Sequence, residues 1–207
     1  MNYKALLDPF DRYAEKTLLI AGFSAMVAGS LLAYLFNGRY DGVLDLHFFR
    51  QVEWIEPFAD NIINAACLLL PLFIAGRIIN GRTRVVDVLT AILIARIPYY
   101  ILPVFNANNY LSNMTDRLLQ QLGEKSAVPG LAAAGLDISF LGVAVILVFA
   151  LVSIIAMIWM IVILFRGFRT ATNLKTNGHK VLFALAIIVA EMLSKIIILK
   201  MGAGTEI

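Results

Sequence analysis

The 207-residue sequence is poor in charged residues, with one cysteine and two histidines. Asp, Glu, Lys and Arg make up 15% of the chain, against about 25% in an ordinary soluble domain. Hydrophobic residues make up 60%, and the mean hydropathy is +0.83. So few charges and so many apolar residues exclude a disordered chain and argue strongly against a soluble globular domain. The composition therefore indicates an integral membrane protein.

The scarcity of metal ligands and nucleophile motifs argues against several kinds of functional site. Cys67 is the only cysteine, so no intramolecular disulfide is possible. His47 and His179 lie in different connecting segments, with no cysteine or second histidine at the spacing of a zinc site. The sequence has no Gly-rich phosphate loop, Gly-x-Ser-x-Gly elbow or His-Glu-x-x-His helix. We therefore expect no metal site, no cofactor and no enzymatic activity.

Five apolar runs are each long enough to cross a bilayer, which takes about 20 residues of helix. They are too long and too uniformly apolar for barrel strands, which have about ten residues of alternating polarity. We therefore predict an all-α polytopic integral membrane protein, in which residues 1–207 form a single transmembrane domain with a bundle of five helices. The predicted spans are 17–36, 58–79, 85–104, 139–165 and 180–199.

Two connecting segments are amphipathic and predict short interfacial helices. One helix is expected to start near Asp8, because Asp8 followed by Pro9 is a good helix start, and to run into the first span. The other covers residues 111–122, where four leucines and Met114 share one face. The simpler interpretation of both is that they anchor a loop at the membrane surface.

The basic residues predict the orientation in the membrane. Ten of the 17 Lys and Arg residues lie in the N-terminal segment and in the second and fourth connections, and five lie on the opposite side. Because basic segments are retained in the cytoplasm, we expect a cytoplasmic N-terminus and an exterior or periplasmic C-terminus in the cell inner membrane. The same division argues against a nucleic-acid partner, although the net charge is +3, because no continuous basic surface is expected.

Ionisable and amide side chains inside three of the spans form the candidate site. Such residues are costly in a bilayer and are functional candidates by default. Arg96 and Glu191 each lie about 16 Å into their spans, at about 1.5 Å per residue, so both are near the midplane and are expected to pair if the spans touch. The predicted intramembrane polar cluster is Arg96, Glu191, Lys195, Asn64 and Asp60.

Three interpretations of this cluster remain open. It is an ion-pair and amide network that holds three helices together, or a polar cavity for a substrate, ion or proton. The third is that the charged side chains extend separately toward the interface without contact between them. Pro71 and Pro98 interrupt two spans, and such breaks occur at transporter binding sites as well as at simple kinks. In the first span a small residue recurs every fourth position from Ala21 to Ala33, which suits helix packing within the chain or dimerisation.

Four features together make the chain resemble the Yip1 family of five-span membrane proteins, especially its short bacterial members. Three are short sequences: Leu7-Asp8-Pro9-Phe10 before the first span, Ala95-Arg96-Ile97-Pro98 in the third, and Arg166-Gly167-Phe168 after the fourth. The fourth is the five-span count with a cytoplasmic N-terminus. The resemblance implies a non-enzymatic protein that acts in membrane organisation or as a scaffold for a membrane-protein partner or a second copy. The alternative is a small transporter or channel with an intramembrane polar site.

Overall fold

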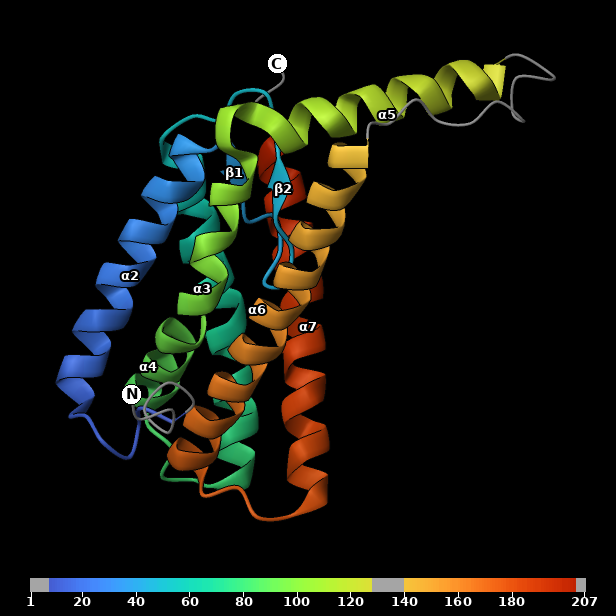
Figure 1. The fold of residues 1–207 in the computed structure, drawn as a ribbon. Helices are drawn as coiled ribbons and strands as arrows, with labels where there is room; N and C mark the ends of the chain where they lie inside the picture. Colours follow the sequence, from blue (N-terminus) through green and yellow to red (C-terminus); the bar gives the residue numbers. More distant parts are fainter. Residues whose placement is uncertain (1–7, 128–139, 204–207) are drawn as a thin grey trace.

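Five long helical segments run side by side in the part of the chain that the structure, a computed structural model, describes: residues 8–127 and 140–203 (Figure 1). All five are long and apolar enough to cross a membrane. This confirms the predicted all-α fold class and makes the chain a multi-pass membrane protein. In chain order the elements are α2 (Glu15–Leu35), β1 (Gly38–Arg39), β2 (His47–Phe48), α3 (Ile55–Ile79), α4 (Val85–Ala95), η1 (Ile97–Asn109), α5 (Tyr110–Ala127), α6 (Phe140–Thr172) and α7 (Asn177–Ala203).

The bundle has two distinct ends. Residue 8, the turn at 80–84 and the turn at 173–176 lie at one end, which we call the N-terminal end (Figure 1). The opposite end holds residues 36–54, α5 and the end of α7, and we call it the hairpin end. The described chain therefore begins and finishes at opposite ends, as an odd number of spans requires.

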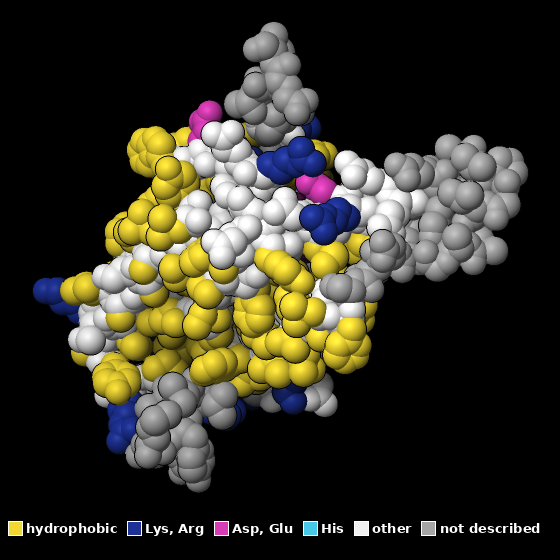
Figure 2. Space-filling view, turned by 45° about the horizontal axis from the view of Figure 1, so that its top comes forward, with side chains coloured by type: hydrophobic (Ala, Val, Ile, Leu, Met, Phe, Trp, Pro, Cys, Tyr) yellow, Lys and Arg dark blue, Asp and Glu magenta, His cyan; other side chains and the backbone are white. Residues whose placement is uncertain are grey.

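The central helix of the bundle is α4, which packs against α2, α3 and α6. Seven of its 11 residues are buried, so this short helix contributes much of the core. The outward faces of α2, α6 and α7 instead carry exposed apolar side chains, including Phe23, Leu151 and Leu185. Hydrophobic side chains cover most of the lower flank of the face in Figure 2. A bilayer satisfies such faces, whereas water would drive them to associate.

The small residues of α2 allow it to approach its neighbours closely. A side chain at Gly29 would clash with the ring of Tyr100 in η1, so this crossing requires glycine. Ala33, one turn further along α2, is also fully buried within the chain. At these positions the small-residue pattern serves packing inside the bundle.

The third span changes its helical geometry at Arg96. There α4 ends and a tighter 3₁₀ helix, η1, begins, with Pro98 in its first turn. Because Pro98 has no N–H, it cannot donate to the carbonyl of Ile94, four residues earlier. The helical conformation of η1 breaks at residues 106–108, where Asn108 has a φ of 55°. The chain then turns into α5, which lies across the hairpin end (Figure 1) and confirms the helix predicted at 111–122.

The predicted helix after Asp8 is wrong for the residues that the structure describes. The chain makes a single turn, in which the N–H groups of Arg12 and Tyr13 donate to the carbonyl of Pro9, and then extends at Ala14. The ring of Phe10 packs so closely on Gly167 of α6 that no side chain would fit at that glycine. Packing on the bundle therefore overrides the local helix-start signal.

Candidate functional site

A hairpin enters the bundle from its hairpin end and lies beside the predicted polar cluster. It comprises residues 38–48, in which β1 and β2 pair antiparallel, with Gly38 opposite Phe48. Figure 1 shows it reaching from the top of the bundle toward the middle. Tyr40 and Val43, in its loop, are fully buried. The segment was expected to be an exterior connection, but its tip is buried inside the helical bundle.

Arg96 is fully buried and holds the tip of the hairpin. Its Nη1 donates to the carbonyl of Val43 at 3.0 Å, and its Nη2 donates to Oδ1 of Asn61 at 3.1 Å. The centre of the guanidinium lies 5.7 Å from the ring of Tyr40 and 5.8 Å from the ring of Tyr100, within cation–π range. No carboxylate among the described residues forms an ion pair with Arg96. Its charge is therefore stabilised by dipoles and aromatic faces.

Glu191 of α7 holds the same part of the hairpin from the other side. Its Oε2 accepts a hydrogen bond from the N–H of Leu44 at 2.8 Å. The carbonyl of Val43 and the N–H of Leu44 belong to one peptide group. Arg96 therefore binds the negative end of this group, and Glu191 binds its positive end. The expected direct pair between the two side chains is not formed. A peptide group offers its negative end to the cation and its positive end to the carboxylate, which satisfies both without contact between them.

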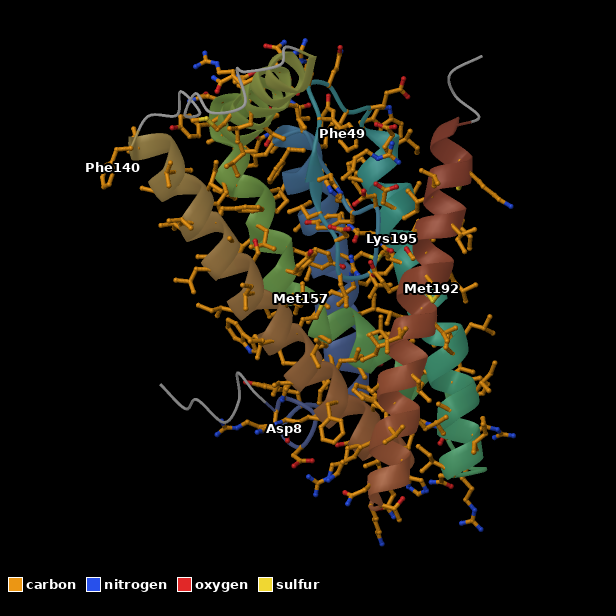
Figure 3. All side chains as sticks on the ribbon, turned by 90° about the vertical axis from the view of Figure 1, so that its right-hand side faces the viewer. Asp8, Phe49, Phe140, Met157, Met192 and Lys195 are labelled. Atoms are coloured by element: carbon orange, nitrogen blue, oxygen red, sulfur yellow. The ribbon has the colours of Figure 1, made fainter. Side chains whose placement is uncertain are left out.

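Lys195 connects α7 to a carboxylate of the hairpin. Its Nζ lies 2.7 Å from Oδ2 of Asp45 and 3.3 Å from Oε1 of Glu191. Figure 3 labels Lys195 and Met192 on α7, beside the hairpin. The Lys195 side chain is 51% exposed, unlike the fully buried Arg96. The structure thus brings Lys195 and Glu191 together, with Asp45 as a third member that the sequence did not indicate.

Amide and hydroxyl groups make further hydrogen bonds to the hairpin backbone. Asn64 Nδ2 donates to the carbonyl of Tyr40 at 2.7 Å, and Asn64 Oδ1 accepts from the hydroxyl of Ser194. The hydroxyl of Tyr99 donates to the carbonyl of Leu44 at 2.7 Å. Backbone groups buried in a membrane-spanning bundle need such partners because no water is available to bond them.

Asp60 is buried but belongs to a separate ion pair. Its carboxylate oxygens lie 3.0 Å from Nε and 2.9 Å from Nη2 of Arg39, a bidentate pair, and Glu56 Oε1 lies 2.6 Å from Arg39 Nη1. These bonds raise the pKa of Arg39, the hydrogen bond to Asp60 being the largest cause. Arg39 thus connects β1 to α3.

The tip of the hairpin fits only because it contains a glycine. A Cβ at Gly42 would lie 2.6 Å from Oε1 of Glu191 and 3.1 Å from Cε of Lys195. Real Cβ atoms do not approach other atoms so closely, so a side chain here would push the tip away from α7. Gly42 therefore lets the backbone reach the two charged side chains of α7.

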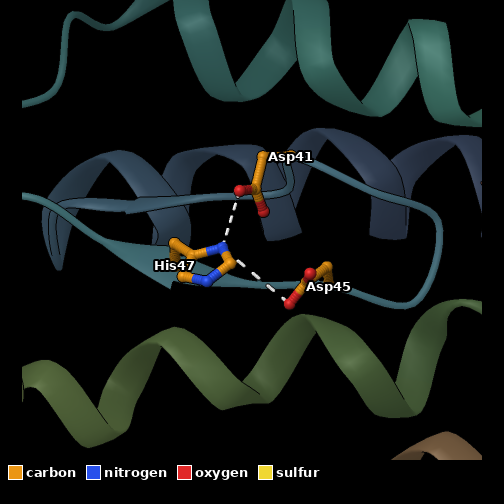
Figure 4. A group of neighbouring side chains, drawn as sticks. All are labelled: Asp41, Asp45 and His47. Atoms are coloured by element: carbon orange, nitrogen blue, oxygen red, sulfur yellow. Dashed lines mark hydrogen bonds and ion pairs between the residues drawn. The ribbon is translucent and has the colours of Figure 1, made fainter. Parts of the chain in front are cut away.

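Three side chains of the hairpin resemble a metal-ligand set. Asp41, Asp45 and His47 lie close together, with His47 Nδ1 2.6 Å from Oδ2 of Asp41 and 3.8 Å from Oδ1 of Asp45 (Figure 4). The hydrogen bond to Asp41 raises the pKa of His47, and the charges of both aspartates add to this, against burial and Lys195. Lys195 and a protonated His47 form ion pairs with the two aspartates. The negative charges of this group are therefore neutralised by side chains of the protein itself.

Some polar atoms of the buried cluster have no hydrogen-bond partner. They are the hydroxyls of Tyr40 and Tyr100 and Nε of Arg96. All three residues are at most 4% exposed. Such atoms are uncommon in a packed interior and mark the least satisfied part of the cluster.

In comparisons with protein-family models, curated proteins and solved structures, no family, relative or solved structure matches the chain. Its function must therefore be inferred from the geometry of the hairpin and the polar cluster.

Proposed function

We propose that this multi-pass membrane protein is a non-enzymatic protein of the Yip1 type, which acts in membrane organisation or as a scaffold for partners. The observation that carries the proposal is the use of Arg96 and Glu191 to hold the Val43–Leu44 peptide of the chain's own hairpin. Groups that bind the protein's own backbone are not free to bind a substrate. The cluster then serves to fix the shape of the membrane domain.

The burial of the groups around Arg96 supports this role. Arg96, Asn61 and Asn64 are fully buried. A transport site must be reached from one side of the membrane and must exchange its partners. A network closed by a hairpin instead gives a rigid bundle with a constant outer surface, which is what a scaffold presents to a partner.

We also propose that the N-terminal end of the bundle faces the cytoplasm of a cell inner membrane. The turns at this end carry Arg82, Arg84 and Lys175, and α6 adds Arg166 and Arg169 just before the second of them. Basic residues near span ends favour the cytoplasmic side. In this orientation the hairpin enters from the exterior or periplasm.

A small transporter or channel is the second candidate, and two observations favour it. Buried polar atoms of Tyr40, Arg96 and Tyr100 lack partners, as they would in a site that admits water. Lys195 is half exposed at membrane depth. In this alternative the hairpin would be a plug that moves.

Water access at position 191 distinguishes the two candidates. Glu191→Cys in a Cys67→Ala background is labelled with a hydrophilic thiol reagent in detergent, where both ends of the bundle are open to the reagent, with Gly81→Cys in an exposed turn as the accessible reference. A scaffold predicts labelling far slower at 191 than at 81, together with a lower melting temperature for Glu191→Gln. Rapid labelling at 191 with an unchanged melting temperature would favour transport and overturn the proposal.

A further inference from the structure

A cavity at the N-terminal end of the bundle has the chemistry of a phospholipid headgroup site. It has a volume of about 800 Å³ and lies between the turn after Asp8 and the end of α6. This volume is within the range of small-molecule sites, about 300–1,000 Å³. Figure 3 shows Asp8 beside the lower end of α6.

One wall of the cavity is basic. It carries Arg166 and Arg169 from the last turns of α6 and Lys175 from the turn that follows. Arg169 and Lys175 are exposed, and no hydrogen bond or ion pair engages either side chain in the part of the chain that the structure describes. Arg166 has only a long contact with Asp8, at 3.5 Å. Two cations thus remain free to bind a phosphate group.

The opposite wall is acidic. Asp8 and Asp11 line it, and Oδ1 of Asp8 is buried without a hydrogen-bond partner. A purely anionic ligand would be repelled here, whereas a ligand that also carries an ammonium group would satisfy both walls. A phosphate joined to a primary amine by a two-carbon link has this arrangement of charges.

The position of the cavity along α6 also suits a phospholipid. Val162 and Phe165 line its inner part, and they belong to the apolar run of α6 that ends at Arg166. From Val162 to Arg169 the helix rises about 10 Å, at about 1.5 Å per residue. The cavity therefore crosses the boundary between hydrocarbon and headgroups, where the phosphate of a lipid lies beside the first carbons of its chains.

We propose that this cavity binds one ethanolamine-type phospholipid of the adjoining leaflet. Arg169 and Lys175 hold its phosphate, the Asp8 and Asp11 carboxylates hold its ammonium group, and the apolar inner wall contacts its acyl chains. This site is independent of the hairpin cluster, which lies toward the other end of the bundle. A lipid bound here would contact both the N-terminal turn and α6, and so stabilise the packing of one on the other.

The test measures lipid retention by native mass spectrometry and thermal stability in detergent. Ethanolamine, choline and glycerol phospholipids with identical chains are compared, with inorganic phosphate as the source of free anion. We expect the ethanolamine lipid to be retained and to raise the melting temperature most, since choline lacks N–H donors and glycerol lacks the cation. Inorganic phosphate should not reproduce the effect.

Variants locate the site. Arg169→Gln with Lys175→Gln should bind the ethanolamine lipid about tenfold more weakly, the loss expected for about one charge-assisted hydrogen bond. The control, Arg82→Gln with Lys180→Gln, removes the same charge at the same end outside the cavity and should bind normally. Asp11→Asn should reduce the preference for ethanolamine over glycerol. Equal losses in the control pair, or no preference among the lipids, would overturn the proposal.

Discussion

Arg96 and Glu191, from the third and fifth spans, bind opposite ends of a single peptide dipole. The carbonyl of Val43 lies 3.0 Å from Arg96 Nη1, and the N–H nitrogen of Leu44 lies 2.8 Å from Glu191 Oε2. The peptide dipole lies between the two side chains, with its negative end toward Arg96 and its positive end toward Glu191. When the hairpin is docked in the bundle, both charged side chains have a hydrogen-bond partner. When the hairpin leaves the bundle, both lose that partner.

The first prediction is that Arg96 and Glu191 are energetically coupled. Hydrogen bonds to charged groups contribute about 1.5–3 kcal/mol in soluble proteins, and polar contacts in membranes average nearer 0.6. We expect Arg96→Met and Glu191→Met each to lower the free energy of unfolding by about 1–2 kcal/mol on this basis. Their double variant should lose less than the sum, because the first substitution already releases the peptide.

A double-mutant cycle in detergent measures this coupling. The difference from additivity should exceed about 0.5 kcal/mol, the usual scatter for independent sites. As a control, Arg82→Met is combined with Glu191→Met; Arg82 lies in the exposed turn at the opposite end of the bundle, so this pair should be additive. Additive losses for Arg96 and Glu191 would show that the hairpin does not join them.

The second prediction concerns the fit of the hairpin tip. Gly42→Ala should destabilise the protein by about 1–3 kcal/mol, the usual cost of overpacking, because the new methyl group meets Glu191 at 2.6 Å. It should also speed thiol labelling of Glu191→Cys by displacing the tip. Gly81→Ala is the control, since no heavy atom lies within 4 Å of a Cβ there. Equal melting temperatures for Gly42→Ala and the unmodified protein would contradict the packing described above.

The membrane spans were predictable because length and uniform hydrophobicity suffice to identify them. The predicted start of the third span, residue 85, agrees with α4 (Val85–Ala95). The second helix begins at Ile55, three residues before the predicted 58, because Ile55, Glu56 and Pro57 add most of a turn ahead of its uniformly apolar part. Such boundaries depend on capping and packing, which hydropathy does not report.

The hairpin was not predictable in the same way, although a signal existed. Between Tyr40 and Phe48, polar and apolar residues nearly alternate, with Asp41, Asp45 and His47 on one side, which is typical of a strand. Nothing in that pattern says that the segment enters the bundle. The partners that hold it, such as Asn64 and Tyr99, are far away in sequence and are brought together only by the helix packing.

The third prediction concerns orientation. Reporter fusions after Asn80 should score cytoplasmic and fusions after Ile207 exterior, because the turn at 80–84 lies at the basic N-terminal end, opposite the end of α7. A fusion at the N-terminus should agree with the one after Asn80. The same location for the fusions after Asn80 and Ile207 would contradict the five-span topology.

The fourth prediction is that the hairpin is more stable at mildly acidic pH. The hydrogen bond to Asp41 raises the pKa of His47 above its usual 6.5, so folding favours the protonated imidazole. Its contribution is complete below about pH 6.5 and is lost as the pH rises through the higher pKa of the folded state. Because His47 is 57% exposed, the ion pair contributes only about 0.2–1 kcal/mol.

The measurement is the melting temperature at pH 6 and pH 9 for the unmodified protein, His47→Gln and His179→Gln. At pH 6, His47→Gln should melt at most about 4 °C lower, the shift expected for about 1 kcal/mol in a chain of this size. This difference should shrink toward pH 9, as the pH rises through the raised pKa of His47 in the folded protein. His179 lies in the first turn of α7 at the opposite end, so its replacement should leave the pH dependence attributed to His47 intact. A pH dependence that survives in His47→Gln and is absent from His179→Gln would show that His179 causes it. This result would contradict the predicted contribution of His47 to hairpin stability.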